Sequence, residues 1–578
     1  MKPVLLGHDV LENPVTLKAE DRKTHMHVIG SSGSGKSKFL EWVIRADIRN
    51  RQGFCLIDPH GTLFRDVLNY CSHLVLERDI VLLDLSEPSH VVGFNPFRRT
   101  ENGDISVQVD RRITATMHAW GVENTDETPT LERTLRLIYT ILIELDLSFE
   151  NAQHLIDFGG HELRDDLIKR IKSPLIRREW EELQALRPKD FRAEVLSAKN
   201  RLFRLLSSKT LSRFFSSHSS PLDLATIIEE GRILLVNLAP SDFLSEENAR
   251  VFGALLVNEF FEVARRRPEH ERNLKHFYLY LDEFQTFVSL DITAMLDQVR
   301  KYKLFTVLAH QRFGQLEQNL ADAVLTNCRI KAVFGGLPFE SARMMAQELF
   351  IRELDAKKIK VAIYQTKFWP KYSRDKVFTS TISSGRSQGR GDNLALGASS
   401  GIVSGEFFRP GDWFLGDISV GTSMTEVGSE NRVRGEHSSE TDFEGLSEGV
   451  SDVPIMIPVP FTELSSVQFY TQEEQLMELT AALKDGFDRH CFIKIHQQKT
   501  QPMRVPFVSS PYTSEENLNW YIQRIHQRTG ATPASEVDTA IEKEQAELFR
   551  KPHRHSKKKT PPKSPEGQQQ WADILGRE

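Results

Sequence analysis

The stretch Gly30-Ser-Ser-Gly-Ser-Gly-Lys-Ser37 decides the fold that we predict for this chain. It fits the pattern G-x-x-x-x-G-K-[ST] of a phosphate-binding P-loop. The apolar run 26–29 before it is typical of a buried strand. Apolar residues at helical spacing follow it, at Phe39, Leu40, Val43, Ile44 and Ile48. A chance lysine in a Gly/Ser-rich turn is the alternative, and the flanking strand and helix argue against it.

Each part of this motif has an expected chemical role. The glycines let backbone N–H groups turn inward around phosphate oxygens, and the helix amino terminus adds partial positive charge. Lys36 would reach the β- and γ-phosphates, and the Ser37 hydroxyl would bind Mg²⁺. The expected cofactors are therefore ATP and Mg²⁺. The expected nucleotide-binding residues are Gly30, Ser31, Ser32, Gly33, Ser34, Gly35, Lys36 and Ser37.

Length and composition set limits on the class of protein. With 578 residues, the chain is long enough for three or four domains. A net charge of -6 excludes a protein whose whole surface coats nucleic acid, so any nucleic-acid surface must be local. The four cysteines are far apart and contain no C-x-x-C, which predicts reduced thiols and no zinc site. No apolar stretch approaches the roughly 20 residues that span a bilayer, which predicts a cytoplasmic protein.

Strand-like runs alternate with helical patterns over two parts of the chain, 1–96 and 223–370. This alternation predicts an α/β fold with a mostly parallel, doubly wound sheet. Between these parts, residues 97–222 show only helical patterns, and we interpret them as an inserted all-helical domain. The seven candidate strands are 26–29, 53–57, 80–84, 233–238, 277–281, 304–308 and 330–334.

The remainder of the chain changes in composition. Residues 371–451 are dense in Gly and Ser and poor in large apolar residues, which predicts a flexible insertion. An ordered β-hairpin arm is the alternative for this segment. Residues 452–549 read as a small α/β unit, with strands at 491–495 and 504–508 and a helix that starts at Ser535 as N-cap. The basic tail 550–578 is expected to be disordered and could contact phosphates.

A second motif completes the expected nucleotide site. The apolar run 277–281 ends in Asp282 and Glu283, the Walker B pattern. Two acids at the end of a buried strand need a cation or a reacting water. Asp282 would hold Mg²⁺, and Glu283 would act as general base on the attacking water. A surface acidic pair after a core strand is the alternative.

Three further polar residues are candidates. Gln311 follows the strand 304–308 and would contact the γ-phosphate or the water, although a loop glutamine without a contact is equally compatible with the spacing. Arg300 would serve as an arginine finger in a neighbour's site, but spacing alone favours a surface arginine. Asp58 ends the second strand of the sheet and would face the ligand crevice.

These residues together resemble the TraG/TraD-type coupling proteins of type IV secretion and conjugation, within the wider HerA/FtsK group of ring-forming P-loop ATPases. The resemblance covers about residues 20–350. The segments that carry it are Met26–Gly30 with the P-loop, Ile57–Gly61, Phe94–Phe97, Leu281–Phe284 and Ala309–Gln311.

This resemblance implies a RecA-like, hexameric motor that hydrolyses ATP between subunits and moves DNA through a central channel. The family's catalytic positions match Lys36, Ser37, Asp282, Glu283 and Gln311. Arg300 matches the family's interface arginine. The resemblance also implies secretion-channel or relaxosome proteins as partners, with the helical insertion facing them.

The sequence departs from the membrane-anchored members, which carry transmembrane helices before the ATPase domain. Only 29 residues precede Gly30, and none could span a bilayer. We therefore expect a cytoplasmic protein that a partner recruits to the inner membrane. Two other functions stay open: a HerA-like ATPase that moves protein cargo or serves a defence system with a nuclease, and a nucleotide-gated scaffold with negligible turnover.

Overall fold

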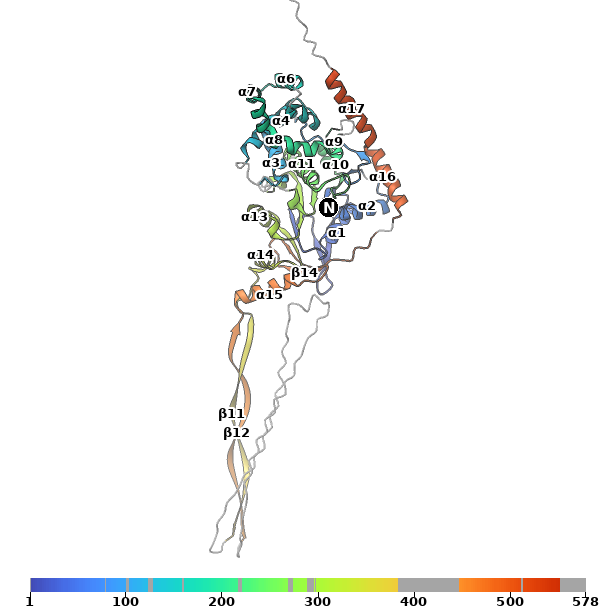
Figure 1. Ribbon diagram of the computed structural model, residues 1–578. Coiled ribbons are helices and arrows are strands. Elements are labelled where there is room, and N and C mark those ends of the chain that lie inside the picture. The colour runs from blue at the N-terminus through green and yellow to red at the C-terminus, as the bar shows by residue number, and fades with distance from the viewer. Residues whose placement is uncertain are drawn as a thin grey trace, which may run out of the picture. The chain divides into compact units, whose positions relative to one another are not determined.

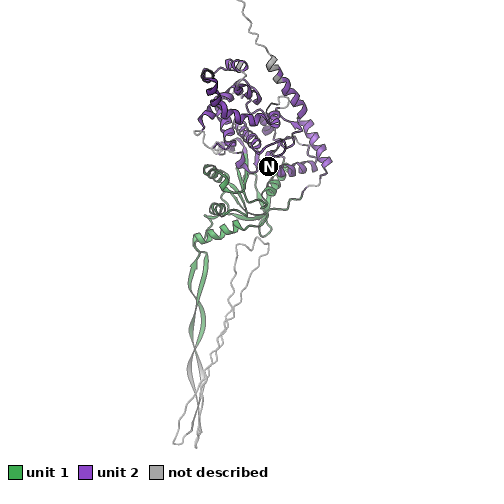
Figure 2. Cartoon of the chain, viewed as in Figure 1, with its two compact units in different colours: residues 1–50, 305–509 green, residues 51–304, 510–578 purple. Residues whose placement is uncertain are grey.

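The computed structural model describes residues 2–77, 79–99, 103–122, 128–157, 161–216, 221–268, 274–287, 296, 298–382, 446–510 and 513–550. The chain divides into two units, which Figure 2 colours separately. Unit 1 comprises residues 1–50 and 305–509, and unit 2 comprises residues 51–304 and 510–578. Each unit is thus assembled from segments that are distant in the sequence.

Unit 1 is built on strands in the order β2 (Pro14–Leu17), β1 (Val4–His8), β14 (Gln501–Arg504), β13 (His490–Ile495), β10 (Ile330–Phe334), β3 (Met26–Ile29) and β9 (Leu304–His310). The strands β10, β3 and β9 are parallel, and the remaining pairs are antiparallel. All four residues of β3 are buried, as expected for a central strand in a parallel sheet. The helices of this unit are α1 (Lys36–Arg49), α13 (Gln318–Asn327), α14 (Phe339–Phe350) and α15 (Gln472–Lys484), shown in Figure 1.

Unit 2 contains four parallel strands in the order β8 (Phe277–Leu281), β4 (Gly53–Asp58), β7 (Ile233–Asn237) and β5 (Ile80–Asp84). Three helices connect or cover them: α2 (Thr62–His73), α10 (Leu224–Glu230) and α11 (Glu246–Arg265). The Ser245 side chain caps α11 by accepting a hydrogen bond from the backbone N–H of Asn248. All seven strands predicted between residues 26 and 334 are present, and the predicted α/β class with a mostly parallel sheet is confirmed.

The range 97–222 holds helices only, as far as its residues are described. The bounds are α3 (Ile105–Ala119), α4 (Pro129–Glu144), a 3-10 turn (Phe149–Asn151), α5 (Ala152–Ile156), α6 (His161–Arg170), α7 (Pro174–Gln184), α8 (Pro188–Leu206) and α9 (Lys209–Ser216). The fully buried Tyr139 and Trp180 belong to the core of this helical part. The helix α3 packs on α11, and Arg112 of α3 donates to the Asn258 side chain of α11 at 2.7 Å.

A long two-stranded ribbon replaces part of the predicted flexible insertion. The strands β11 (Ile359–Ile382) and β12 (Leu446–Phe469) pair antiparallel along their whole length (Figure 1). Residues 371–382 and 446–451, predicted to be flexible, belong to these strands. Main-chain hydrogen bonds hold such a strand pair together, and they do not require buried side chains. This part accords with the hairpin alternative. Residues 383–445 lie outside the described residues.

The segment 452–549 does not form a unit of its own. The strands β13 and β14 join the sheet of unit 1 through β10 and β1, whereas the helices that follow belong to unit 2. The strand predicted at 504–508 is wrong, because β14 spans Gln501–Arg504 and the residues after Arg504 are not in a strand. The other predicted domain boundaries stay predictions.

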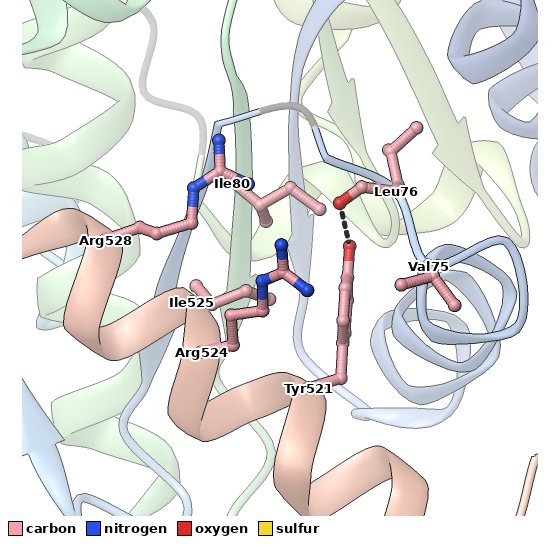
Figure 3. Close-up of a pocket in the computed structure, with 7 residues that line it drawn as sticks. All are labelled: Val75, Leu76, Ile80, Tyr521, Arg524, Ile525 and Arg528. Atoms are coloured by element: carbon pink, nitrogen blue, oxygen red, sulfur yellow. Dashed lines mark hydrogen bonds between the residues drawn. The ribbon is translucent and has the colours of Figure 1, made fainter.

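The C-terminal helices α16 (Glu515–Thr529) and α17 (Ala534–Arg550) are fastened to unit 2 by side chains. The Tyr521 hydroxyl donates to the Leu76 carbonyl at 2.8 Å, beside a cavity of only about 10 Å³ (Figure 3). A cavity of that size holds one water at most, so it is a packing feature. Helix α17 begins at Ala534, so the predicted N-cap at Ser535 is wrong. Asp538 accepts two hydrogen bonds from the Arg213 guanidinium, both 2.7 Å long.

Two further predictions concern the chemistry of the chain as a whole. All four cysteines are free and buried, and burial raises the pKa of the Cys55 thiol well above its ordinary value. In the part of the chain that the structure describes, no helix is both long enough and apolar enough to cross a bilayer. The basic tail 551–578 lies outside the described residues.

Candidate nucleotide-binding site

The P-loop forms a turn between β3 and α1 with the backbone geometry that phosphate binding needs. Gly33 and Gly35 have φ angles of +82° and +100°, which glycine adopts without strain. Gly35 is the residue before the first turn of α1, and Lys36 opens the helix. A left-handed residue before a helix start turns successive N–H groups toward one concave surface. The Lys36 side chain is 5% exposed and therefore lies within the fold.

A second pair of glycines supports the P-loop from behind. Ser31 donates to the Gly335 carbonyl through both its N–H (3.4 Å) and its hydroxyl (3.2 Å). A Cβ on Gly336, whose φ is +77°, would lie 2.1 Å from the Ser31 Oγ. The Ser34 hydroxyl donates to the Ser31 carbonyl at 2.8 Å. The backbone that follows β10 therefore packs against the P-loop. No sequence motif indicated this contact.

Gln311 is brought to this loop by the register of two parallel strands. Ile29 of β3 pairs with His310 of β9, so the residues that follow them, Gly30 and Gln311, leave the sheet side by side. The Gly30 N–H donates to the His310 carbonyl at 3.3 Å. The structure therefore places Gln311 next to the first residue of the P-loop within unit 1.

A buried histidine pair lies beneath this junction. The Nε2 atoms of His27 and His310 are 2.8 Å apart, and both rings are fully buried. The His310 Nδ1 lies 3.2 Å from the Arg312 carbonyl, which can only accept. His310 therefore carries a proton on Nδ1, and one of the two facing Nε2 atoms donates to the other. Burial, with His310 and Lys331 nearby, lowers the pKa of His27 well below 6.5, so His27 is neutral.

The Walker B acids occupy the carboxyl end of β8 in unit 2. Asp282 and Glu283 are 3% and 5% exposed. The Asp282 N–H donates to the Ile57 carbonyl at 3.3 Å, and the Glu283 N–H donates to the Asp282 carboxylate at 3.1 Å. Glu283 has a φ of +47°, an unusual conformation for a residue with a side chain, and its carboxylate accepts from Gln285 at 2.8 Å. Such strain is typical of functional positions.

Polar side chains continue along this edge of unit 2. Strand register places Asp58 opposite Asn237 and Asn237 opposite Asp84. The two Asp58 oxygens accept from the backbone N–H groups of His60 and Phe64, both at 2.8 Å. Asp58 thus holds the start of α2. Burial raises the pKa of Asp84 to about 6, against hydrogen bonds that include one from Asn237.

Arg300 lies in a 3-10 turn, Arg300–Tyr302, directly before β9, and is exposed. A hydrogen bond fixes this turn: the Arg267 guanidinium donates to the Tyr302 carbonyl at 2.6 Å. The same guanidinium also donates to the Lys275 carbonyl at 2.9 Å. Gln311 follows the other end of the same seven-residue strand. At about 3.3 Å per residue, the two ends are roughly 23 Å apart.

The residues present fit a nucleotide with Mg²⁺. In unit 1, the concave glycine turn and the buried Lys36 suit phosphate oxygens, and the Ser37 hydroxyl is a ligand that Mg²⁺ accepts. In unit 2, taken by itself, the Asp282 carboxylate is also a ligand that Mg²⁺ accepts. Mg²⁺ commonly takes only one or two protein ligands together with phosphates and waters. Among the described residues, no group of three or more His, Cys, Asp and Glu side chains could hold a metal by itself.

Residues 276–355 match the family model described as the TraM recognition site of TraD and TraG. The matched range runs from β8 through α14 and includes Asp282, Glu283, Arg300 and Gln311. The resemblance to TraG/TraD-type coupling proteins, inferred from the motifs, is thereby confirmed. No curated protein matches the chain.

Several solved structures are similar to this chain. The bacterial conjugative coupling protein TrwBdeltaN70 is 13% identical with a TM-score of 0.48, over 88% of this chain and 90% of that chain. TrwB in complex with ADP and Mg²⁺ is 13% identical with a TM-score of 0.45, over 89% and 92%. VirB4 of Thermoanaerobacter pseudethanolicus is 13% identical with a TM-score of 0.41, over 61% and 89%.

Proposed function

We propose that this protein is an ATP-driven motor of the coupling-protein type, which moves DNA toward a type IV secretion or conjugation apparatus. The observation that supports this proposal is the register of β3 and β9, in which the residues directly before Gly30 and Gln311 pair. A phosphate-binding loop with a polar amide at its entrance is suited to sensing or hydrolysing the terminal phosphate. The family match over 276–355 supports the coupling-protein type.

The catalytic roles follow from the chemistry of each side chain. Lys36 would hold the phosphates and the Ser37 hydroxyl would hold Mg²⁺, for which the Asp282 carboxylate is also a suitable ligand. Glu283 takes the proton of the attacking water, for which a carboxylate in a nearly dry environment is suited. These assignments predict an ATPase rather than a binding protein.

We further propose that the working form is a homo-hexamer with nucleotide between subunits. Arg300 is exposed and precedes β9, whereas Gln311 follows that strand. An arginine at that end of the strand would reach a nucleotide bound by a neighbouring copy. An arginine finger of this kind stabilises charge in the transition state of phosphoryl transfer.

The partners we propose are DNA and a protein of the relaxosome or the secretion channel. The name of the matched family, a TraM recognition site, supports a protein partner in the range 276–355. A protein partner at the inner membrane would also account for recruitment to that membrane.

The deciding experiment is an ATPase assay with and without single- and double-stranded DNA, combined with a mass measurement in the presence of nucleotide. We expect DNA to stimulate turnover and nucleotide to favour the hexamer. Stimulation by a protein partner without any effect of DNA would favour the motor for protein cargo. A Glu283→Gln variant that retains full biological activity would favour the nucleotide-gated scaffold.

A further inference from the structure

Unit 1 contains a basic groove away from the P-loop. The groove has a volume of about 980 Å³ and lies where β10 begins, β13 ends and α14 ends. Its lining has five cationic side chains and two carboxylates, in a chain whose net charge is -6. The cations are Arg329, Lys331, Arg352, Lys494 and Lys499, and the carboxylates are Glu348 and Glu353.

The two carboxylates are already committed to structural contacts. Glu348 pairs with Lys331 at 2.6 Å, and Glu353 accepts from the Thr500 N–H at 2.7 Å and from its hydroxyl at 2.8 Å. The Lys494 ammonium donates to the carbonyls of Glu348 and Leu349 at the end of α14. Lys331 therefore balances the charge of Glu348, and the lining as a whole keeps three more cations than carboxylates.

Positive charge is concentrated on one face of the sheet here. The register of β10 and β13 places Lys331 directly opposite Lys494, so both side chains lie on the same face of the sheet. Around them, Arg329, Arg352 and Lys499 make no ion pair with any described residue. A surface with this excess of positive charge, three exposed cations of which make no ion pair with a described residue, attracts an anionic partner.

We infer that this groove binds the phosphate backbone of a nucleic acid. Ile351 is the one aliphatic side chain in its lining, so the groove offers little to the apolar body of a small ligand. Guanidinium groups match phosphate oxygens in a two-pronged geometry, and the amides of Gln497 and Gln498 can bind sugar or base atoms. This inference rests on the proposed function, because it names where that motor holds its DNA.

The groove is separate from the nucleotide site. Arg329 and Lys331 lie at the amino end of β10, whereas the P-loop follows the carboxyl end of β3, which runs parallel to β10. Changes in the groove should therefore alter nucleic-acid binding and leave nucleotide binding and basal ATP turnover unchanged.

The test compares two triple variants of the full chain. The groove variant is Arg329→Gln/Arg352→Gln/Lys499→Gln. The control variant, Lys18→Gln/Arg343→Gln/Lys357→Gln, removes three exposed cations of unit 1 that lie outside the groove and make no ion pair with described residues. Both variants change the net charge of the protein by the same amount. A difference between them in nucleic-acid binding therefore depends on where the removed cations lie. Circular dichroism melting checks that both variants fold.

The readout is the salt dependence of binding to fluorescein-labelled single-stranded and duplex oligonucleotides. Three lost phosphate contacts should make the slope of log K against log salt shallower by about 2 for a single strand and about 3 for a duplex. The control variant should keep the wild-type slope. A poly-glutamate peptide of equal length should compete poorly.

Each outcome decides the inference. A groove variant with the wild-type slope overturns the groove as the binding site, while the motor proposal stands if DNA still stimulates ATP turnover. A wild-type protein that neither binds DNA nor responds to it overturns both. Equal losses in the two triple variants show a net-charge effect only and overturn the groove, and poly-glutamate that competes fully shows an acidic protein partner instead.

Discussion

Gly336 is expected to control nucleotide affinity although it lies outside every nucleotide-binding motif. A methyl group at this position would lie 2.1 Å from the Ser31 Oγ and 2.9 Å from the Ser31 Cβ, well inside van der Waals contact. Ser31 is tied to the neighbouring Gly335 carbonyl, so it cannot move without disturbing the turn that follows. Gly336→Ala should therefore push the P-loop out of its phosphate-binding geometry.

The size of the effect follows from two contributions. A left-handed alanine costs about 1–2 kcal/mol of folding free energy, since Gly336 has a φ of +77°. Displacing one backbone N–H from a charged phosphate costs about 1.5–3 kcal/mol of binding free energy. The second contribution corresponds to a loss of nucleotide affinity of roughly 10- to 150-fold.

The matched control is Gly530→Ala. Gly530 ends α16 with a φ of +66°, and a Cβ there would meet nothing within 4 Å. Both variants should lose thermal stability, Gly336→Ala the more because of its contact with Ser31. Only Gly336→Ala should lose affinity for a non-hydrolysable ATP analogue in isothermal titration calorimetry. Combining Gly336→Ala with Ser31→Gly removes the obstructing atoms and should restore the affinity to that of Ser31→Gly alone.

The reasoning is refuted if Gly336→Ala binds the analogue as tightly as Gly530→Ala does. It is also refuted if the Ser31→Gly change gives no recovery, because the steric contact with Ser31 would then not be the cause.

Four further predictions follow from the site and its surroundings. Glu283→Gln should bind ATP normally and lower kcat by about 10²- to 10⁴-fold, measured as phosphate release. Arg300→Ala should be inactive alone but regain activity when mixed with a Lys36→Ala variant, since mixed rings contain intact interfaces. His27→Phe should lower the free energy of unfolding by about 1–3 kcal/mol, because it leaves a buried ring nitrogen of His310 unpaired. Asp538→Asn should lower Tm at pH 7, because the hydrogen bond from Arg213 stabilises the ionised carboxylate. This hydrogen bond is the main reason that the pKa of Asp538 is lowered from 3.8 to about 2. Its ionised form stabilises the fold by about 1 kcal/mol after solvent screening, fully above pH 3.8, and this difference in Tm disappears as the pH falls through about 2.

Local patterns in the sequence were sufficient to predict the elements that carry the site. The β3 strand, the P-loop and α1 follow from one contiguous stretch of sequence. The acids after β8 were found because a buried strand that ends in two carboxylates is chemically unusual. These inferences depend on neighbours in sequence, which periodicity and motif spacing report directly.

Contacts between distant segments could not be predicted in the same way. Ser31 meets Gly335, His27 meets His310, and Arg213 meets Asp538, each across hundreds of residues. Such contacts depend on strand order and register, which the period of a pattern does not specify. The position of Asp58 facing the ligand crevice stays a prediction, and its two oxygens accept from backbone N–H groups of the turn that follows.

The order of strands in unit 1 also has a consequence for synthesis. Both neighbours of β3, the strands β9 and β10, are encoded after residue 303. A ribosome that adds about 5–20 residues per second needs roughly tens of seconds to reach them. Throughout that interval the apolar strand β3 has neither of its partners, and the nascent chain is a natural target for a holding chaperone. Amino-terminal fragments that stop before β9 should be unable to retain ATP.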